Sequence, residues 1–107
     1  MLIDTHAHIY VDAFDSDREE VVRRAFDAGV EDIVMPAIGV PSIRQALDLS
    51  EWYDGLHTMA ALHPSEVKEA SDADLDAVRE WCEDPRIVAV GESGLDYYWD
   101  QIGRASC

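Results

Sequence analysis

The chain has 107 residues, of which 23 are acidic and 8 basic, so its formal net charge is -15, and 48% of the residues are hydrophobic. That length suffices for one soluble domain with its own core. The negative charge disfavours nucleic-acid binding through Lys and Arg, although bound cations would reverse the sign locally. Because the sequence has neither 18 consecutive apolar residues nor a basic-then-apolar start, we expect no membrane span or secretory signal, and a cytoplasmic location.

Four short aliphatic segments alternate with polar segments of helical periodicity. We expect the aliphatic segments, residues 2–5, 32–38, 56–62 and 87–90, to be strands. A strand and a helix that repeat about every 25 to 30 residues are typical of a parallel sheet.

Each intervening segment carries local signals for a helix. The first opens with Ser16 and Glu19 in the spacing of a capping box and ends before Gly29. The second begins at Pro41, where the missing N–H costs little, and the third runs from about Asp72 until Pro85 stops it. Their apolar stripes are Val21, Val22, Ala25 and Phe26; Ile43, Ala46 and Leu47; and Leu75, Val78 and Cys82.

The pattern predicts an α/β fold built from about four βα units with parallel strands. A closed (β/α)8 TIM-type barrel typically needs about 250 residues, so the chain would supply its N-terminal half. The alternative is a small open sheet with its own edges.

His6 and His8 follow the first expected strand, where a two-residue period points them to the same side as Asp4. On a strand their α-carbons would lie roughly 6 to 7 Å apart, within reach of one shared cation. A His-x-His pair by itself is more often solvated than a site. The carboxyl ends of parallel strands form the working face of βα folds, however, and this favours metal binding.

His63 and Glu92 also follow strand ends, those of the third and fourth expected strands. An ionised Glu92 between glycines, after an apolar run, would be costly unless paired or bound to a cation. A carboxylate that caps a following turn is the alternative. His57 begins the third strand, at the opposite end, and we expect it to be structural or surface-exposed.

Four segments carry a resemblance to a known family. They are residues 3–8 (IDTHAH), 24–30 (RAFDAGV), 61–66 (ALHPSE) and 90–98 (VGESGLDYY). Together they make roughly residues 1–100 resemble the N-terminal half of the TatD family of metal-dependent hydrolases. His-x-His is shared with many metallohydrolases, whereas the last segment is much more specific.

The resemblance implies a TIM-like barrel with two divalent cations, Mg²⁺, Mn²⁺ or Zn²⁺, that hydrolyses phosphodiester bonds, often as a deoxyribonuclease. By position, His6, His8 and Glu92 match metal ligands, and His63 matches a histidine that contacts substrate phosphate. The implied substrate is DNA or another phosphoester. An amide or lactone substrate stays open, because the same metals can activate water against a carbonyl.

The family's remaining ligands, two histidines and an aspartate, belong to its second half. We therefore expect residues 1–100 to form a half-barrel that is inactive alone, and residues 101–107 to be an irregular tail, through truncation or a non-family end. The alternative function is a noncatalytic half-barrel that binds a partner, or a second copy of itself, through its edge strands.

Overall fold

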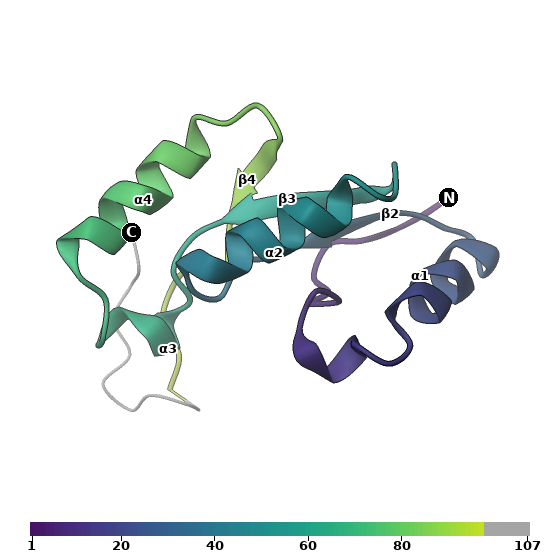
Figure 1. Cartoon of the computed structure of the whole chain (residues 1–107), viewed down its shortest axis with the longest axis horizontal. Coiled ribbons are helices and arrows are strands. Elements are labelled where there is room, and N and C mark those ends of the chain that lie inside the picture. The colour runs from purple at the N-terminus through teal and green to yellow at the C-terminus, as the bar shows by residue number, and fades with distance from the viewer. Residues whose placement is uncertain (98–107) are drawn as a thin grey trace.

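The computed structural model describes residues 1–97, which form one four-stranded sheet with helices (Figure 1). Its strands are β1 (Leu2–Asp4), β2 (Val30–Met35), β3 (Leu56–Ala60) and β4 (Ile87–Val90). They are ordered β1-β2-β3-β4, and every neighbouring pair is parallel. The expected α/β fold with consecutive parallel strands is confirmed. The tail expected over residues 101–107 lies outside the described residues.

Three helices connect the strands, as the periodicity predicts. They are α1 (Arg18–Asp27), α2 (Val40–Ser50) and α4 (Asp72–Cys82). A one-turn helix α3 (Pro64–Val67) and a 3-10 turn η1 (Asp12–Phe14) were not expected, because elements this short show no periodicity. Among the described residues, no helix is long and apolar enough to cross a membrane.

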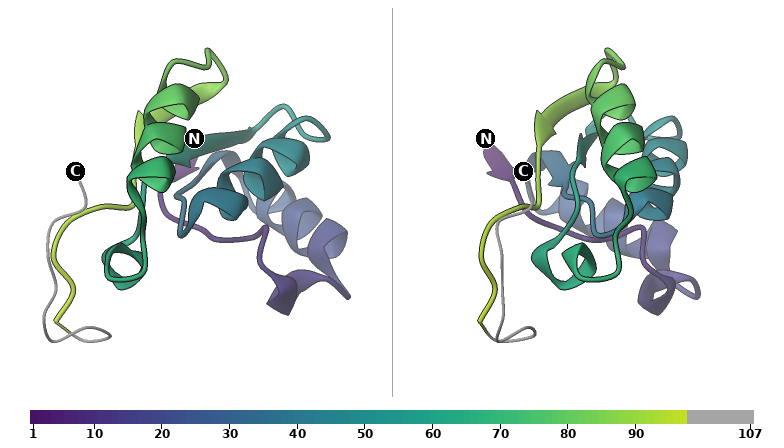
Figure 2. Two further views of the ribbon diagram at one scale, coloured as in Figure 1. Left: turned by 60° about the vertical axis from the view of Figure 1, so that its left-hand side comes forward. Right: turned by 90° about the vertical axis from the view of Figure 1, so that its left-hand side faces the viewer.

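The three longer helices cover one face of the sheet, and the core lies between the two layers (Figure 2). Along β3, every second side chain is buried. Because alternate side chains point to opposite faces of a sheet, these buried side chains face the helices. Two apolar clusters fill this layer. The first includes Val22, Ile33, Met35 and Leu56, and the second includes Ile43, Leu47, Ala60 and Val78.

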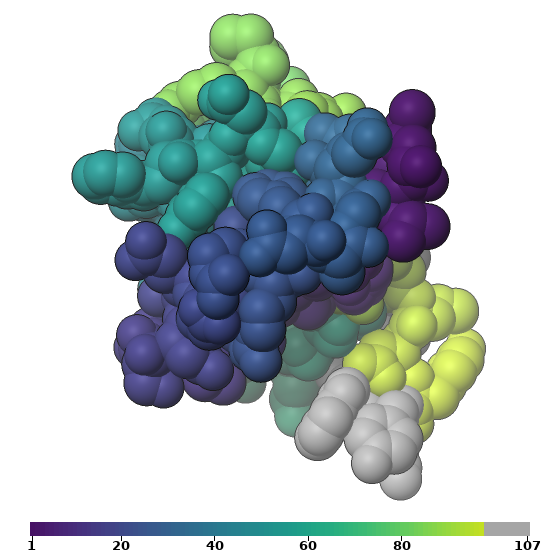
Figure 3. Space-filling model, turned by 90° about the vertical axis from the view of Figure 1, so that its right-hand side faces the viewer, coloured from purple at the N-terminus to yellow at the C-terminus, as the bar shows by residue number. Residues whose placement is uncertain are grey.

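The edge strands β1 and β4 leave apolar side chains exposed. Leu2 and Ile3 on β1 are 59% and 54% exposed, and Val88 and Val90 on β4 are 54% and 63% exposed. Figure 3 shows the N-terminal residues standing open at the surface. The described sheet therefore ends in two unpaired apolar edges.

Three of the four strands end earlier than the hydrophobic pattern predicts, whereas β4 ends at Val90 as expected. β2 stops at Met35, because Pro36 has no N–H to donate to a neighbouring strand. β3 stops at Ala60, two residues before the expected end, and β1 stops at Asp4. The segments that follow are irregular, and they carry the polar side chains.

The expected capping box at Ser16 is wrong. The residue before α1 is Asp17, and its side chain makes no capping bond. A tertiary contact sets this helix start instead, because Arg18 binds backbone carbonyls of the preceding loop. The capping box lies at α4, where Ser71 Oγ accepts from the Asp74 amide at 3.2 Å and Asp74 Oδ2 accepts from the Ser71 amide at 2.9 Å.

Replacing Ser16 and Ser71 in turn tests which of the two serines caps a helix. Ser71→Ala should lower the free energy of unfolding by about 1 kcal/mol, because the first turn of α4 loses its side-chain acceptor. Ser16→Ala should leave it unchanged. Urea unfolding followed by circular dichroism measures both, and equal losses would contradict the assignment.

Candidate metal centre

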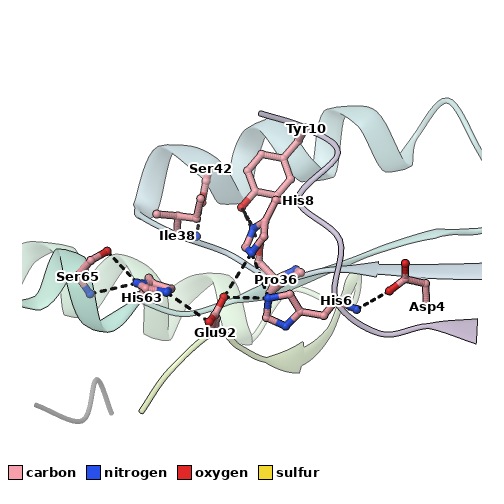
Figure 4. Close-up of polar contacts among 10 residues, drawn as sticks. All are labelled: Asp4, His6, His8, Tyr10, Pro36, Ile38, Ser42, His63, Ser65 and Glu92. Carbon is pink, nitrogen blue, oxygen red and sulfur yellow. Dashed lines mark hydrogen bonds and ion pairs between the residues drawn. The ribbon is translucent and has the colours of Figure 1, made fainter. Parts of the chain in front are cut away.

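The polar side chains converge at the carboxyl ends of the strands (Figure 4). His6 and His8 follow β1, His63 follows β3 and Glu92 follows β4. On a flat sheet, β1 and β4 would lie three strand spacings apart, about 14 Å. Side chains from the two edges nevertheless touch, so the segments after the strands must lean toward one another.

A three-residue segment after β2, residues 36–38, draws these segments together through its backbone. The carbonyl of Ala37 accepts a hydrogen bond from the Glu92 amide at 3.3 Å. The carbonyl of Ile38 accepts one from the His63 amide at 2.8 Å. Two of the four polar residues are thus positioned by the same short stretch of main chain.

Three ligand atoms from His6, His8 and Glu92 face one another. His6 Nε2 lies 3.2 Å and His8 Nε2 lies 3.3 Å from Glu92 Oε2, and the two nitrogens are 3.2 Å apart. Metal bonds of about 2.0 to 2.2 Å in a tetrahedral shell place ligand atoms roughly 3.3 to 3.6 Å apart. The three atoms are therefore spaced as one face of such a shell, and the donor set fits a divalent cation.

The electrostatics of His8 favour a neutral ring. Burial and, next, the neighbouring His6 imidazole lower the pKa of His8, while Glu92 raises it by a smaller amount. At neutral pH the ring therefore keeps an unprotonated nitrogen, which is the form that binds metals.

His63 presents a proton to Glu92. Its Nδ1 accepts from the Ser65 amide at 3.1 Å, where it caps α3, so the proton of a neutral ring sits on Nε2. That Nε2 lies 3.3 Å from Glu92 Oε1, the carboxylate oxygen that does not contact the other two histidines. His63 is thus built as a hydrogen-bond donor beside the cluster.

Tyr10 contacts His8 at Nδ1, the ring nitrogen that does not face Glu92. Its hydroxyl lies 3.0 Å from His8 Nδ1 and donates to the Pro36 carbonyl at 2.7 Å. The side chain is buried, and burial raises the pKa of Tyr10 to about 12, so the phenol keeps its proton at neutral pH.

Arg18 fixes the loop that carries His8 and Tyr10. Its Nε donates to the Ile9 carbonyl at 2.8 Å, and one terminal nitrogen donates to the carbonyls of Tyr10 and Val11 at 3.2 and 2.8 Å. A single guanidinium therefore binds three consecutive carbonyls, which a Lys ammonium on its flexible stem could not match.

Two other polar residues lie apart from the cluster. His57 pairs with Asp32 on β2, with 2.8 Å between His57 Nε2 and Asp32 Oδ1. Asp4 Oδ1 accepts from the His6 amide at 3.0 Å, so it shapes the turn after β1 and does not join the ligand atoms.

Sequence reasoning did not identify Tyr10, Arg18 or Ser65 as parts of the site. All three act through or beside backbone groups, and a hydrogen bond to a distant carbonyl leaves no spacing pattern in the sequence. Proximity was the one available signal for Tyr10 and Ser65, since each lies two residues after a candidate histidine.

Comparisons with known proteins all point to one group. Residues 3–106 match the family model described as TatD related DNase. The chain is 39% identical over 101 residues to the uncharacterized metal-dependent hydrolase YabD of Bacillus subtilis, and 33% identical over 96 residues to the 3'-5' ssDNA/RNA exonuclease TatD of Salmonella typhimurium. These alignments cover 94% and 90% of this chain.

Structural comparison agrees with the sequence matches. The crystal structure of YjjV, a TatD homologue from Escherichia coli K12, superposes with a TM-score of 0.82 at 35% identity, over 94% of this chain and 39% of that one. The chain likewise spans 40% of YabD and 37% of the Salmonella protein. The described fold therefore corresponds to the N-terminal half of a TIM-type barrel.

Removing the guanidinium of Arg18 should loosen the loop after β1. We expect Arg18→Ala to lower the free energy of unfolding by about 2 kcal/mol, because three carbonyls lose a charged donor. Arg23→Ala is the matched control, since Arg23 bonds only exposed carboxylates on its own helix and its loss should have no measurable effect. Chemical denaturation of both variants checks this, and an equally mild effect of Arg18→Ala would contradict the assigned role.

Proposed function

The chain belongs to the TatD-related DNase family, and on this premise we propose that it supplies the first ligand cluster of a metal-dependent phosphodiesterase. The observation that supports the proposal is the mutual spacing, 3.2 to 3.3 Å, of His6 Nε2, His8 Nε2 and Glu92 Oε2. One imidazole proton cannot bridge all three pairs of atoms at once, whereas a divalent cation can be shared by all three.

A divalent cation held by these groups, Mg²⁺, Mn²⁺ or Zn²⁺, would polarise phosphate oxygens and lower the pKa of a bound water. The complete site would hold two such ions. Zn²⁺ takes about four ligands and Mg²⁺ about six, so three side chains cannot complete two shells. We accordingly expect the 107-residue chain to bind metal but to need ligands from further βα units for turnover.

His63 would contact the substrate. Its Nε2–H already points at Glu92 Oε1, so it is a donor at the rim of the ligand cluster. A phosphate oxygen beside the metal could accept that proton in a charge-assisted hydrogen bond. DNA or another phosphoester fits a chain of net charge -15 because the cations, and not surface Lys or Arg, would meet the phosphate. The name of the Salmonella relative favours single-stranded nucleic acid among these substrates.

Metal titration of ligand variants tests the proposal. Isothermal titration of the 107-residue chain with Zn²⁺ should show binding that His6→Gln, His8→Gln and Glu92→Gln each weaken by more than about tenfold, since each removes one ligand. His57→Gln, which alters a histidine paired with Asp32 away from the cluster, should leave the affinity unchanged. Absence of binding by the wild type, or an equal loss in His57→Gln, would overturn the metal centre.

The exposed edge strands favour a second candidate function, self-association. Within residues 1–97, β1 and β4 each pair with one neighbouring strand, and both carry exposed apolar side chains. Unpaired edges of this kind add strands from another chain. The net charge opposes contact between two copies, so salt should promote pairing by screening the repulsion.

Sedimentation velocity at low and high KCl concentration tests the edge interaction. The dimer fraction should rise with salt, and Val88→Lys should suppress it by placing a charge on the β4 edge. Leu75→Lys is the control, because Leu75 is an exposed apolar residue on a helix, α4, and not on either edge strand. A monomer at every concentration and salt level would exclude self-association.

A further inference from the structure

We propose that Tyr10 is a positioning residue that holds His8 with its proton on Nδ1, so that the Nε2 lone pair is directed at His6 and Glu92. The use of that lone pair rests on the proposed metal centre. The tautomer itself is a property of the ion-free chain and can be measured separately.

Proton accounting fixes the tautomer. The Tyr10 hydroxyl has one hydrogen, and its bond to the Pro36 carbonyl at 2.7 Å requires that hydrogen, because a carbonyl only accepts. The contact of 3.0 Å between Tyr10 Oη and His8 Nδ1 must then use a hydrogen from the ring. A neutral imidazole has only one such hydrogen, so Nε2 is bare.

The side chain of Ser42 also lies beside the Tyr10 hydroxyl, but its Oγ donates its own hydrogen to the Gly39 carbonyl at 2.6 Å and already accepts from the Ile38 amide at 2.8 Å. Tyr10 is only 5% exposed, which leaves little room for water to take either role. Its own carbonyl accepts from Arg18, so the backbone is held as well as the ring. The acceptor, Pro36, belongs to the segment whose carbonyls also accept hydrogen bonds from the backbone amides of His63 and Glu92.

The contacts made by Nδ1 of His63 and by Nδ1 of His8 give these two histidines opposite tautomers around the Glu92 carboxylate. His63 carries its proton on Nε2, because its Nδ1 accepts from a backbone amide, and it faces Glu92 Oε1. His8, with its proton on Nδ1, faces Glu92 Oε2 with a lone pair. The two oxygens of Glu92 are thereby distinguished: Oε1 meets a proton donor, and Oε2 lies where lone pairs converge.

Imidazole nitrogen spectra of the ion-free 107-residue chain test the tautomer directly. Long-range ¹H–¹⁵N correlation above the titration range of histidine should show the wild-type His8 protonated on Nδ1, with its signals identified by their loss in His8→Gln. In Tyr10→Phe the population should move toward Nε2–H. Tyr53→Phe is the matched control, because it removes the hydroxyl of a partly buried tyrosine that packs near Phe26, away from the site.

Zn²⁺ titration of the same variants supplies the functional readout. Tyr10→Phe should weaken binding by about 10- to 100-fold, as loss of an outer-shell partner usually does, and Tyr53→Phe should not. A wild-type His8 protonated on Nε2, or weaker binding in Tyr10→Phe with unchanged tautomer populations, would overturn the proposal.

Two further outcomes stay decisive. If Tyr10→Phe does not fold, the wild-type spectrum alone decides the tautomer. If no variant binds Zn²⁺, the metal centre fails, while the spectra of wild type and Tyr10→Phe still decide whether Tyr10 sets the tautomer.

Discussion

The main chain of residues 36–38 is the constraint on which the candidate site depends. The site draws on segments after three strands, and β1 and β4 lie at opposite edges of the sheet. This short segment follows β2, between them, and offers carbonyls and amides that β-ladder bonds do not consume. Its partners come from each of the other segments and from α2: Tyr10, Ser42, His63, Gly91 and Glu92.

The net negative charge of the chain is consistent with cation binding at this cluster. An excess of 15 negative charges attracts cations to the whole surface, but only a cluster with fixed lone pairs can retain one in a defined place. Glu92 supplies the one formal charge among the three ligand atoms, and two imidazoles complete the donor set without adding to the repulsion. The same acidity that argues against direct nucleic-acid binding is therefore compatible with a phosphate substrate met through metal ions.

Periodicity and strand-end rules predicted the parallel sheet and the three longer helices, because these depend on which face of each element is apolar. The family was indicated separately, by the resemblance of four short segments to known motifs. The same rules selected His6, His8, His63 and Glu92, which the structure places together. They failed where one tertiary contact outweighs a local signal, as at Ser16, where the binding of Arg18 to loop carbonyls sets the helix start. Tyr10 was missed for a related reason, since its partner Pro36 is 26 residues away and contributes only a carbonyl.

The use of backbone atoms in residues 36–38 has a consequence for how this region can vary. Exchange of the buried Ala37 or of Ile38 for a residue of similar size, other than proline, would leave every donor and acceptor of that stretch in place. Insertion or deletion of one residue would instead displace the peptide groups by about 3.3 Å and turn alternate carbonyls away from their partners. The length of the β2–α2 connection, more than its side chains, is what related chains must keep constant for the four polar residues to meet.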